Sequence, residues 1–344
     1  MKILRFVLIP FVPIFAVIVK LRNILFETNF FKTAFVAAKV ISVGNINVGG
    51  SGKTPLVIYL ANHFKKENKK VGVLSRGYRR KSKGYVLVSD GENIYPNVES
   101  CGDEILLTAL ECKVPCAVSE KRIEGAKNLI STFGVDTIIL DDAFQHRWIK
   151  RDIDLLICEQ KFLISPDFFD HYLLPAGLMR EPFTAIERAH AVIINRKFSQ
   201  PRDLPSNVEK YFKNKRIFTS YYAAKGFVDI KRKVEYNMRE FEGQKSLVVC
   251  GIANPYSFFT ALKQTNVDTE NYLIFGDHKY YTNKEIQKIR KMFYSTNSHS
   301  VVTTQKDAVK LTEYKNELDD IDIFYLKIEL VMDDEKSFID FIMN

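Results

Sequence analysis

One stretch decides the fold of this chain: Val40-Ile-Ser-Val-Gly-Asn-Ile-Asn-Val-Gly-Gly-Ser-Gly-Lys-Thr-Pro55. A β-branched run leads into a glycine cluster, and Lys53-Thr54 then begin an apolar pattern of helical spacing that includes Leu56, Leu60 and Phe64. Pro55 falls in the first turn of that helix, where its missing N–H costs little. A strand, a glycine-rich loop, Lys-Thr and a helix in this order predict a phosphate-binding loop (P-loop) in an α/β fold.

This loop has the parts that phosphate binding requires. Its glycines let backbone N–H groups converge on phosphate oxygens without a Cβ in the way, and the helix N-terminus adds positive potential. Lys53 would place its ammonium on the β- and γ-phosphate oxygens, and the Thr54 hydroxyl would ligate Mg²⁺. The pattern G-x-x-x-x-G-K-T has glycine where this chain has Asn47, so a glycine turn that binds nothing is the alternative. The predicted nucleotide-binding residues are Asn47, Val48, Gly49, Gly50, Ser51, Gly52, Lys53 and Thr54.

The composition suits an anionic partner. The 344 residues carry 50 Lys and Arg against 41 Asp and Glu, and the resulting net charge of +9 fits nucleic acid, a phospholipid surface or a phosphorylated substrate. A chain of this length has room for about two domains. The five cysteines contain no CxxC pair and are odd in number, so we expect reduced cysteines in a cytosolic protein.

An apolar run at residues 6–19 holds fourteen uncharged residues between flanking lysines and arginines. It is shorter than the about 20 residues that span a bilayer. The following Lys20-Leu-Arg-Asn-Ile24 does not supply the small residues of a signal-peptide cleavage site. We therefore predict a membrane-associating helix within residues 1–30 that lies in the membrane interface. The alternative is a buried helix packed on the domain.

Two carboxylate pairs occur where α/β sheets bind their ligands. An apolar strand pattern ends abruptly in Asp141-Asp142, and in P-loop enzymes an aspartate at this place meets Mg²⁺. Ionised groups at a buried strand end need a partner, so packing alone does not explain the pair. Asp103 and Glu104 begin an apolar helix, where they are either capping residues or carboxylates that face the γ-phosphate.

Further polar residues fall near the same predicted rim. Arg76 follows a strand in a basic, glycine-bounded loop, which makes it a candidate phosphate contact, with a solvated turn as the alternative. A lone histidine such as His146 is usually structural, but this one lies on the ligand edge of the sheet. The full set of these candidates is Arg76, Arg122, Gln145, His146, Arg180 and Glu181.

Strand and helix patterns fall into two groups along the chain. Five strand patterns in the first 200 residues predict a doubly wound parallel sheet in a P-loop domain at 31–215. The alternation restarts and predicts a smaller α/β domain at 245–330, whose strand ends carry polar residues that would face the P-loop across a cleft. Residues 216–230 would form a linker by pairing with the segment near 322–331, and 331–344 a C-terminal helix.

The chain resembles the tetraacyldisaccharide 4'-kinase family, the lipid A 4'-kinases of Gram-negative bacteria, over nearly its whole length. That family also lacks glycine at the place of Asn47, but it usually has Gly where Ala143 stands and Glu where Gln305 stands. The matching segments are Val43-Gly-Asn-Ile-Asn-Val-Gly-Gly-Ser-Gly-Lys-Thr-Pro55, Ser75-Arg-Gly-Tyr78, Gly102-Asp-Glu104, Leu140-Asp-Asp-Ala-Phe-Gln-His146, Leu174-Pro-Ala-Gly177 with Arg180-Glu181, Gly251-Ile-Ala-Asn-Pro255, Phe275-Gly-Asp-His278 and Thr303-Thr-Gln-Lys-Asp-Ala308.

The resemblance implies two α/β/α domains joined by a two-stranded linker, in a peripheral enzyme on the cytoplasmic face of the bacterial inner membrane. The implied activity is Mg-ATP-dependent phosphorylation of the 4' hydroxyl of a tetraacyldisaccharide 1-phosphate, which gives lipid IVA, and a monomer would suffice for it. Asp103 and His278 are the implied catalytic pair, acting with Lys53. Metal-binding candidates are Thr54, Asp141 and Glu104. Substrate candidates are Arg76, Arg122, Asp142, Gln145, His146, Arg180 and Glu181.

Three other functions compete with this interpretation. A membrane-associated P-loop ATPase that acts as an assembly or targeting switch would carry a signature lysine where this chain has Val48. A nucleic-acid-binding protein is suggested by charge alone, and no recognition module is present, so we expect no nucleic-acid partner. A different small-molecule kinase would share the loop but not the segments beyond residue 100.

Overall fold

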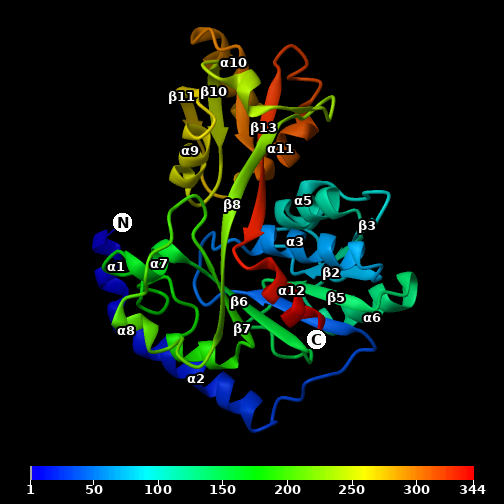
Figure 1. The fold of residues 1–344 in the computed structure, drawn as a ribbon, viewed down its shortest axis with the longest axis vertical. Helices are drawn as coiled ribbons and strands as arrows, with labels where there is room; N and C mark the ends of the chain where they lie inside the picture. Colours follow the sequence, from blue (N-terminus) through cyan, green and yellow to red (C-terminus); the bar gives the residue numbers. More distant parts are fainter. Residues whose placement is uncertain (1) are drawn as a thin grey trace.

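The computed structural model describes residues 2–344, with side chains from Arg5 onward. Within these residues thirteen strands form one continuous, mainly parallel sheet. The chain has two lobes joined by strands β8 (Arg216–Asp229) and β13 (Ile323–Met332), as Figure 1 shows. The small lobe, residues 230–322, is the upper part of Figure 1, and the large lobe, residues 2–215 with 333–344, is the lower part. The predicted mixed α/β class is confirmed.

Strand order in the sheet departs from sequence order, as expected where helices cross between parallel strands. Only the pairs β13–β8, β3–β4 and β8–β9 (Glu235–Tyr236) are antiparallel among the described residues. The strands follow one another in space as β11 (Asp268–Ile274), β10 (Lys245–Cys250), β12 (Ser300–Thr304), β13, β8, β7 (Ala191–Asn195), β6 (Ile153–Glu159), β1 (Lys39–Gly44), β5 (Thr137–Asp141), β2 (Val71–Ser75), β4 (Pro115–Val118) and β3 (Val86–Asp90).

Helices cover both faces of the large-lobe sheet, because successive strand residues point to opposite sides. In β1, Ile41 and Val43 join the core under α3 and α5, whereas Val40 joins the core under α6. The helices are α1 (Lys2–Leu8), η1 (Ile9–Phe11), α2 (Val12–Glu27), α3 (Lys53–Lys66), α4 (Val98–Cys101), α5 (Asp103–Cys112), α6 (Arg122–Phe133), α7 (Gln160–Ile164), η2 (Phe183–Arg188), α8 (Ser206–Glu209), η3 (Met238–Phe241), α9 (Pro255–Lys263), α10 (Asn283–Ser295), α11 (Gln305–Leu311), η4 (Thr312–Tyr314) and α12 (Glu335–Met343).

The two lobes are linked by an antiparallel ribbon in which β8 pairs with β13 over nearly its full length, with Tyr222 opposite Leu330. The predicted pairing of these two segments is therefore confirmed. The chain enters the small lobe along β8, returns along β13, and ends in α12 against the large lobe. Phe338 of α12 is fully buried there beside Phe218, with ring centroids 5.0 Å apart.

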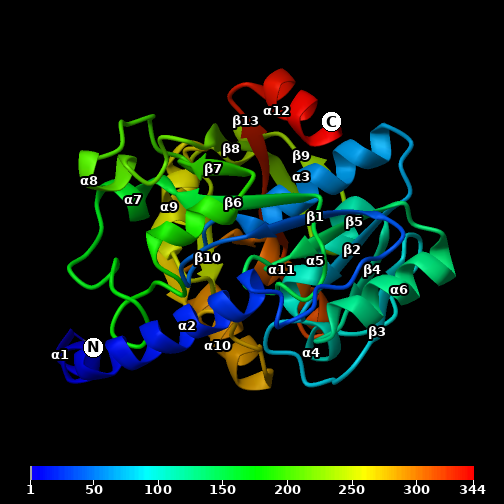
Figure 2. The same cartoon turned by 90° about the horizontal axis from the view of Figure 1, so that it is seen from below.

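Helices α1, η1 and α2 follow one another along one edge of the large lobe, which is clearest in Figure 2. In α2 only Val19 and Phe26 are buried, and large apolar side chains such as Ile14 and Ile18 are exposed. Most of the helix is therefore not buried, although Val19, Phe26 and the Arg22–Glu181 ion pair attach it to the large lobe. The helical stretch Arg5–Glu27 has 23 residues and is long and apolar enough to cross a membrane, a test that N-terminal signal sequences also pass.

Three strands, β3, β4 and the two-residue β9, were not predicted from the sequence. β4 has only four residues, and β3 is an edge strand that runs antiparallel to it, so neither offers a long apolar run. The five cysteines are buried and free, in agreement with the prediction of reduced thiols.

Candidate active site

The phosphate loop connects β1 to α3 as predicted. Residues 48–54 line a cavity of about 470 Å³ between the lobes. Gly52, which precedes α3, has φ 108°, and a Cβ there would lie 2.3 Å from the side chain of Asn195. Glycine is therefore required at this position. Asn47 does not line the cavity, because its side chain turns back and donates to the Val48 carbonyl (3.1 Å).

Two asparagines hold the loop from beneath. Asn195, the last residue of β7, donates its amide to the Ser51 carbonyl (3.2 Å), and Asn45 donates to the Ser51 hydroxyl (3.0 Å). Both asparagines are fully buried. The sequence analysis assigned neither a role, although each lies at or just beyond the carboxyl end of a predicted strand.

Asp141 and Asp142 lie at the carboxyl end of β5, but in different environments. Asp141 is buried; one of its oxygens accepts from the Ser75 hydroxyl (3.1 Å), and the other, Oδ1, has no partner. Burial, together with the nearby Glu104 and Asp142 charges, raises the pKa of Asp141. Asp142 is partly exposed and lies 3.6 Å from Lys53 Nζ. Burial opposes ionisation of Asp142, but Lys53 and Arg180 outweigh it and lower its pKa.

These residues fit a Mg²⁺ ion that also takes oxygens from a phosphate. In residues 2–344, no group of three or more His, Cys, Asp or Glu side chains is placed to hold a metal by itself. Mg²⁺ bound beside a nucleotide needs only one or two protein oxygens, since phosphate and water complete its octahedron. The unpaired Oδ1 of Asp141 and the hydroxyl of Thr54, in the first turn of α3, offer such oxygens.

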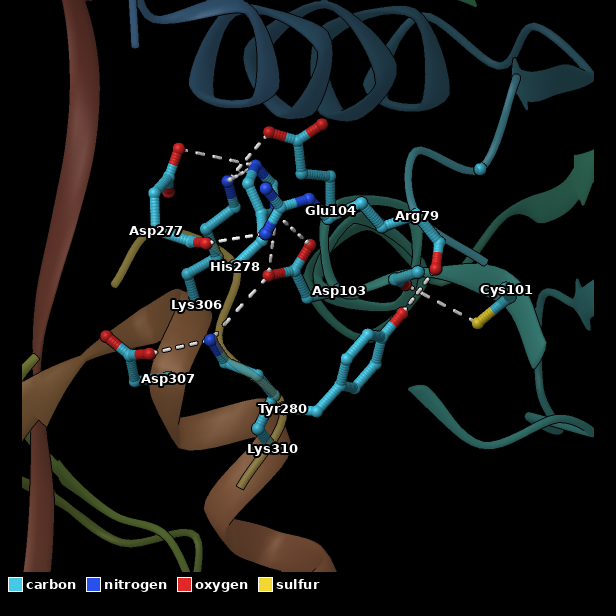
Figure 3. Close-up of polar contacts among 12 residues, drawn as sticks. Arg79, Cys101, Asp103, Glu104, Asp277, His278, Tyr280, Lys306, Asp307 and Lys310 are labelled. Atoms are coloured by element: carbon cyan, nitrogen blue, oxygen red, sulfur yellow. Dashed lines mark hydrogen bonds and ion pairs between the residues drawn. The ribbon is translucent and has the colours of Figure 1, made fainter. Parts of the chain in front are cut away.

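Asp103 and His278 meet across the gap between the lobes. Asp103 is the first residue of α5 in the large lobe, and His278 follows β11 in the small lobe. His278 Nδ1 lies 3.0 Å and 3.1 Å from the two Asp103 oxygens (Figure 3). Burial opposes ionisation of Asp103, but the His278 hydrogen bond and the charges of Lys306 and Lys310 outweigh it and hold its pKa well below the usual range.

Other contacts hold the two lobes together around this pair, so the lobes are closed on each other. Arg79 donates to the Asp277 carbonyl (2.8 Å), and the Tyr280 hydroxyl donates to the Arg79 carbonyl (2.7 Å). Glu104 lines the cavity and accepts from Lys306 of the small lobe (2.7 Å). These contacts also surround Asp103 and His278 in Figure 3.

Two of the predicted substrate residues, Asp142 and Arg180, line the cavity. Arg76, Gln145 and His146 do not line it. Arg180 donates to both oxygens of Asp142 (2.9 and 3.0 Å), and Gln145 donates to the Asn45 carbonyl (2.8 Å). Arg76 is exposed. Burial and the neighbouring arginines 122, 151 and 76 lower the pKa of His146 to about 4, so it is neutral at pH 7.

Arg122 and Glu181 are the predicted substrate residues that are almost fully buried. Arg122 is almost fully buried and donates to the Ser119 and Asp141 carbonyls (2.7 and 3.3 Å). Glu181 is fully buried, with Arg22 and Arg188 at 3.2 and 2.9 Å. Neither side chain lines the cavity. Their positions suit support of the site, with Glu181 fixing α2 to the large lobe.

The cavity has a polar end at the phosphate loop and an apolar wall. Its volume lies within the range of about 300–1,000 Å³ that is usual for small-molecule sites. The sequence analysis missed several of its lining residues, although Lys306 lay in a segment that it singled out. These missed residues include Tyr78, Lys197, Phe198, Tyr222, Phe258, Asp277, Lys306 and Ile328.

Comparison with known proteins agrees with this geometry. The sequence profile of the family described as LpxK: Tetraacyldisaccharide-1-P 4'-kinase matches residues 4–344. The chain is 34% identical to the tetraacyldisaccharide 4'-kinase of Halothermothrix orenii over 352 residues, which cover 96% of this chain and 89% of that protein. It is 37% identical to the protein of the same name from Phocaeicola vulgatus over 308 residues, covering 86% and 81%.

A solved structure matches equally well. The crystal structure of LpxK from Aquifex aeolicus in complex with ATP superposes with a TM-score of 0.81 at 31% identity, covering 99% of this chain and 98% of that one. Sequence profile, relatives and structure agree over almost the whole length. The chain therefore belongs to the tetraacyldisaccharide 4'-kinase family.

Proposed function

We propose that this chain is an ATP-dependent kinase that phosphorylates the 4' hydroxyl of a tetraacyldisaccharide 1-phosphate, a step of lipid A biosynthesis that yields lipid IVA. One observation carries the proposal: the Asp103–His278 pair lies between the lobes beside the cavity that the phosphate loop lines. A carboxylate–imidazole pair suits removal of a proton from a hydroxyl. A phosphate loop suits the nucleotide that provides the phosphoryl group.

In the proposed reaction the sugar hydroxyl oxygen attacks the γ-phosphorus in line. A new O–P bond forms, and the bond from the γ-phosphorus to the β,γ-bridging oxygen breaks with its electron pair staying on ADP. Asp103, held ionised by its neighbours, accepts or orients the hydroxyl proton, and His278 assists it. Because the two residues come from different lobes, the site is complete only when the lobes are closed, which limits futile ATP hydrolysis.

The phosphate loop and its neighbours would hold the nucleotide. Backbone N–H groups of residues 48–54 and the Lys53 ammonium bind phosphate oxygens, while Asn195 keeps the loop in shape from beneath. Thr54 and Asp141 would hold Mg²⁺, and Glu104 would join them once it releases Lys306. The bound ion would neutralise negative charge on the phosphates. The apolar cavity wall, which includes Phe258 and Ile328, suits the base of the nucleotide.

The phosphorylated sugar would bind beside Arg180 and Asp142, which line the cavity and pair with each other. We assign it to Arg76, Asp142, Gln145, His146 and Arg180, with Arg122 and Glu181 supporting the loops that carry them. The acyl chains would remain in the bilayer beside α1 and α2, whose apolar side chains are exposed. We propose a monomeric enzyme that binds peripherally to the cytoplasmic face of the inner membrane.

The domain boundaries remain part of this proposal. We assign residues 1–30 to membrane association, 31–215 to the kinase domain, 216–230 to the linker, 245–330 to the smaller domain and 331–344 to the C-terminal helix. The division at residue 330 falls within β13 (Ile323–Met332).

The decisive test is transfer of labelled γ-phosphate from Mg-ATP to tetraacyldisaccharide 1-phosphate in detergent micelles. The wild type should produce the 4'-phosphorylated product. Asp103→Ala and His278→Ala should each lower kcat at least about 10²-fold, the usual size for acid–base groups. Asp203→Asn, an exposed large-lobe change, is the matched control and should keep full activity. Absence of product with the wild type would refute the kinase assignment.

A further inference from the structure

Lys306 lies where the small lobe meets the cavity. It is the second residue of α11, and its side chain lines the cavity with about 20% of its surface exposed. Its ammonium lies 2.7 Å from Glu104 Oε1 and 3.4 Å from His278 Nε2 (Figure 3). An ammonium has three N–H donors, so a third donor remains for a ligand in the cavity.

Glu104 lies between two lysines of opposite lobes. Burial opposes its ionisation, but the charges of Lys306 and Lys53 lower its pKa. Glu104, Lys53 and Lys306 all line the same cavity. Lys53 follows the phosphate loop directly, so an anion bound there is approached by a large-lobe cation on one side and a small-lobe cation on the other.

Lys310, one turn further along α11, differs from Lys306 because it is buried away from the cavity, with its ammonium 3.7 Å from Asp103 Oδ2. It is 4% exposed, does not line the cavity, and pairs with Asp307 (2.7 Å). Asp307 is fully buried and also accepts from the Gly251 amide (2.8 Å) and the Thr304 hydroxyl (2.8 Å). This network fixes the N-terminal turns of α11, and Lys306 is the α11 lysine that it leaves facing the cavity.

We propose that Lys306 is a catalytic residue, a small-lobe cation that contacts the γ-phosphoryl group during its transfer. The inference rests on the proposed kinase function and adds a role to a residue of the same site. Glu104 holds the Lys306 ammonium in place before the nucleotide binds, and the ammonium then turns to the equatorial oxygens of the phosphoryl group. Negative charge spreads over these oxygens as the bond to ADP breaks, and a preorganised cation stabilises it most in the transition state.

The test compares Lys306→Met with Lys306→Arg, and with Lys284→Met as the matched control. Lys284 is an exposed lysine on α10 of the same lobe. Lys306→Met should lower kcat about 10²–10³-fold, the size expected for one lost transition-state donor, with KM for ATP changed by less than about fivefold. Lys306→Arg keeps the charge and should recover at least about tenfold of the loss. Lys284→Met should match the wild type.

A second measurement separates catalysis from simple loss of the Glu104 ion pair. Aluminium fluoride with Mg-ADP mimics the phosphoryl group in transfer, and it should tighten nucleotide binding to the wild type. In Lys306→Met this tightening should fall about 10²-fold while the Kd of Mg-ADP alone stays the same. Unchanged tightening, a kcat loss below about fivefold, or an equal kcat loss in Lys306→Met and Lys306→Arg would overturn the inference. Failure of the wild type to phosphorylate the glycolipid would instead overturn the kinase assignment.

Discussion

Asp141 of the large lobe and Asp307 of the small lobe are both buried aspartates at the carboxyl edge of a parallel sheet, and their surroundings differ. Asp307 accepts hydrogen bonds from the Gly251 amide, the Thr304 hydroxyl and the Tyr281 hydroxyl, and pairs with Lys310. Asp141 accepts one hydrogen bond from Ser75, and its Oδ1 has no partner.

The contrast distinguishes a binding site, which has an unpaired buried oxygen for a ligand, from a structural network in which the buried carboxylate is already paired. A buried carboxylate oxygen without a partner costs free energy unless something binds it. The large-lobe rim therefore holds its polar groups ready for phosphate and metal. In the small-lobe rim Asp307 is already paired, and this network fixes the start of α11, the helix that carries Lys306.

The largest expected effect on activity comes from Lys53, the cation at the phosphate loop of the large lobe. Lys53→Ala should abolish phosphoryl transfer, because the β- and γ-phosphates lose the ammonium that neutralises them. The free energy of unfolding should change little, since the recorded partner of Lys53, Asp142, lies 3.6 Å away and also has Arg180. Transfer assays and urea unfolding on the same preparation check both parts. Retained ATP-dependent transfer would count against the role of the loop.

The complementary experiment removes Asp307, the carboxylate at the centre of the small-lobe network. Asp307→Ala leaves Lys310 buried without its nearest partner and also orphans the Gly251 amide, so it should cost about 3–5 kcal/mol of folding free energy. Urea unfolding followed by circular dichroism gives this value. Stability within about 1 kcal/mol of the wild type would show that the buried network is not the scaffold inferred here.

Asp141→Asn should have the opposite profile, with activity lost and stability kept. Asparagine replaces a buried carboxyl group whose ionised form is disfavoured by burial and by the nearby carboxylates. The ligand-free variant should therefore be at least as stable as the wild type at pH 7. Loss of a metal-binding oxygen should lower kcat about 10²-fold. Raising the Mg²⁺ concentration in the transfer assay should recover part of the lost kcat. Any loss of kcat in Asp307→Ala should not respond to Mg²⁺.

The smallest expected effect is a pH dependence of the free energy of unfolding that comes from His146 in the large lobe. The pKa of His146 is lowered from 6.5 to about 4 in the folded state, so below pH 6.5 the unfolded chain takes up the proton first. Stability should therefore fall as pH drops from about 6.5 to 4, by on the order of 1 kcal/mol after solvent screening. His146→Gln should lack this component in urea unfolding at several pH values. A phosphorylated glycolipid bound nearby should reduce it by favouring the protonated imidazole.

The phosphate loop and the Asp103–His278 pair could be predicted from sequence because each depends on a motif with a fixed spacing or on a family resemblance. The strands β1, β2, β5, β6 and β7 were predictable because they are apolar runs bounded by polar residues. The roles of Asn195 and Lys306 were not, because each depends on a contact over more than 140 positions of sequence. The burial of Arg122 and Glu181 could not be predicted either, because the sequence does not determine whether a charged side chain near a strand end points into the protein or into the cavity.

The path of the chain through the β8–β13 ribbon has a consequence for biosynthesis. The core of the large lobe includes Phe338 and Ile342 of α12, which pack with Leu56, Leu60 and Phe218. The ribosome adds these two residues only after the entire small lobe has been made. During translation the apolar α1–α2 stretch is made before α12, so this stretch can reach a bilayer before the kinase core can close.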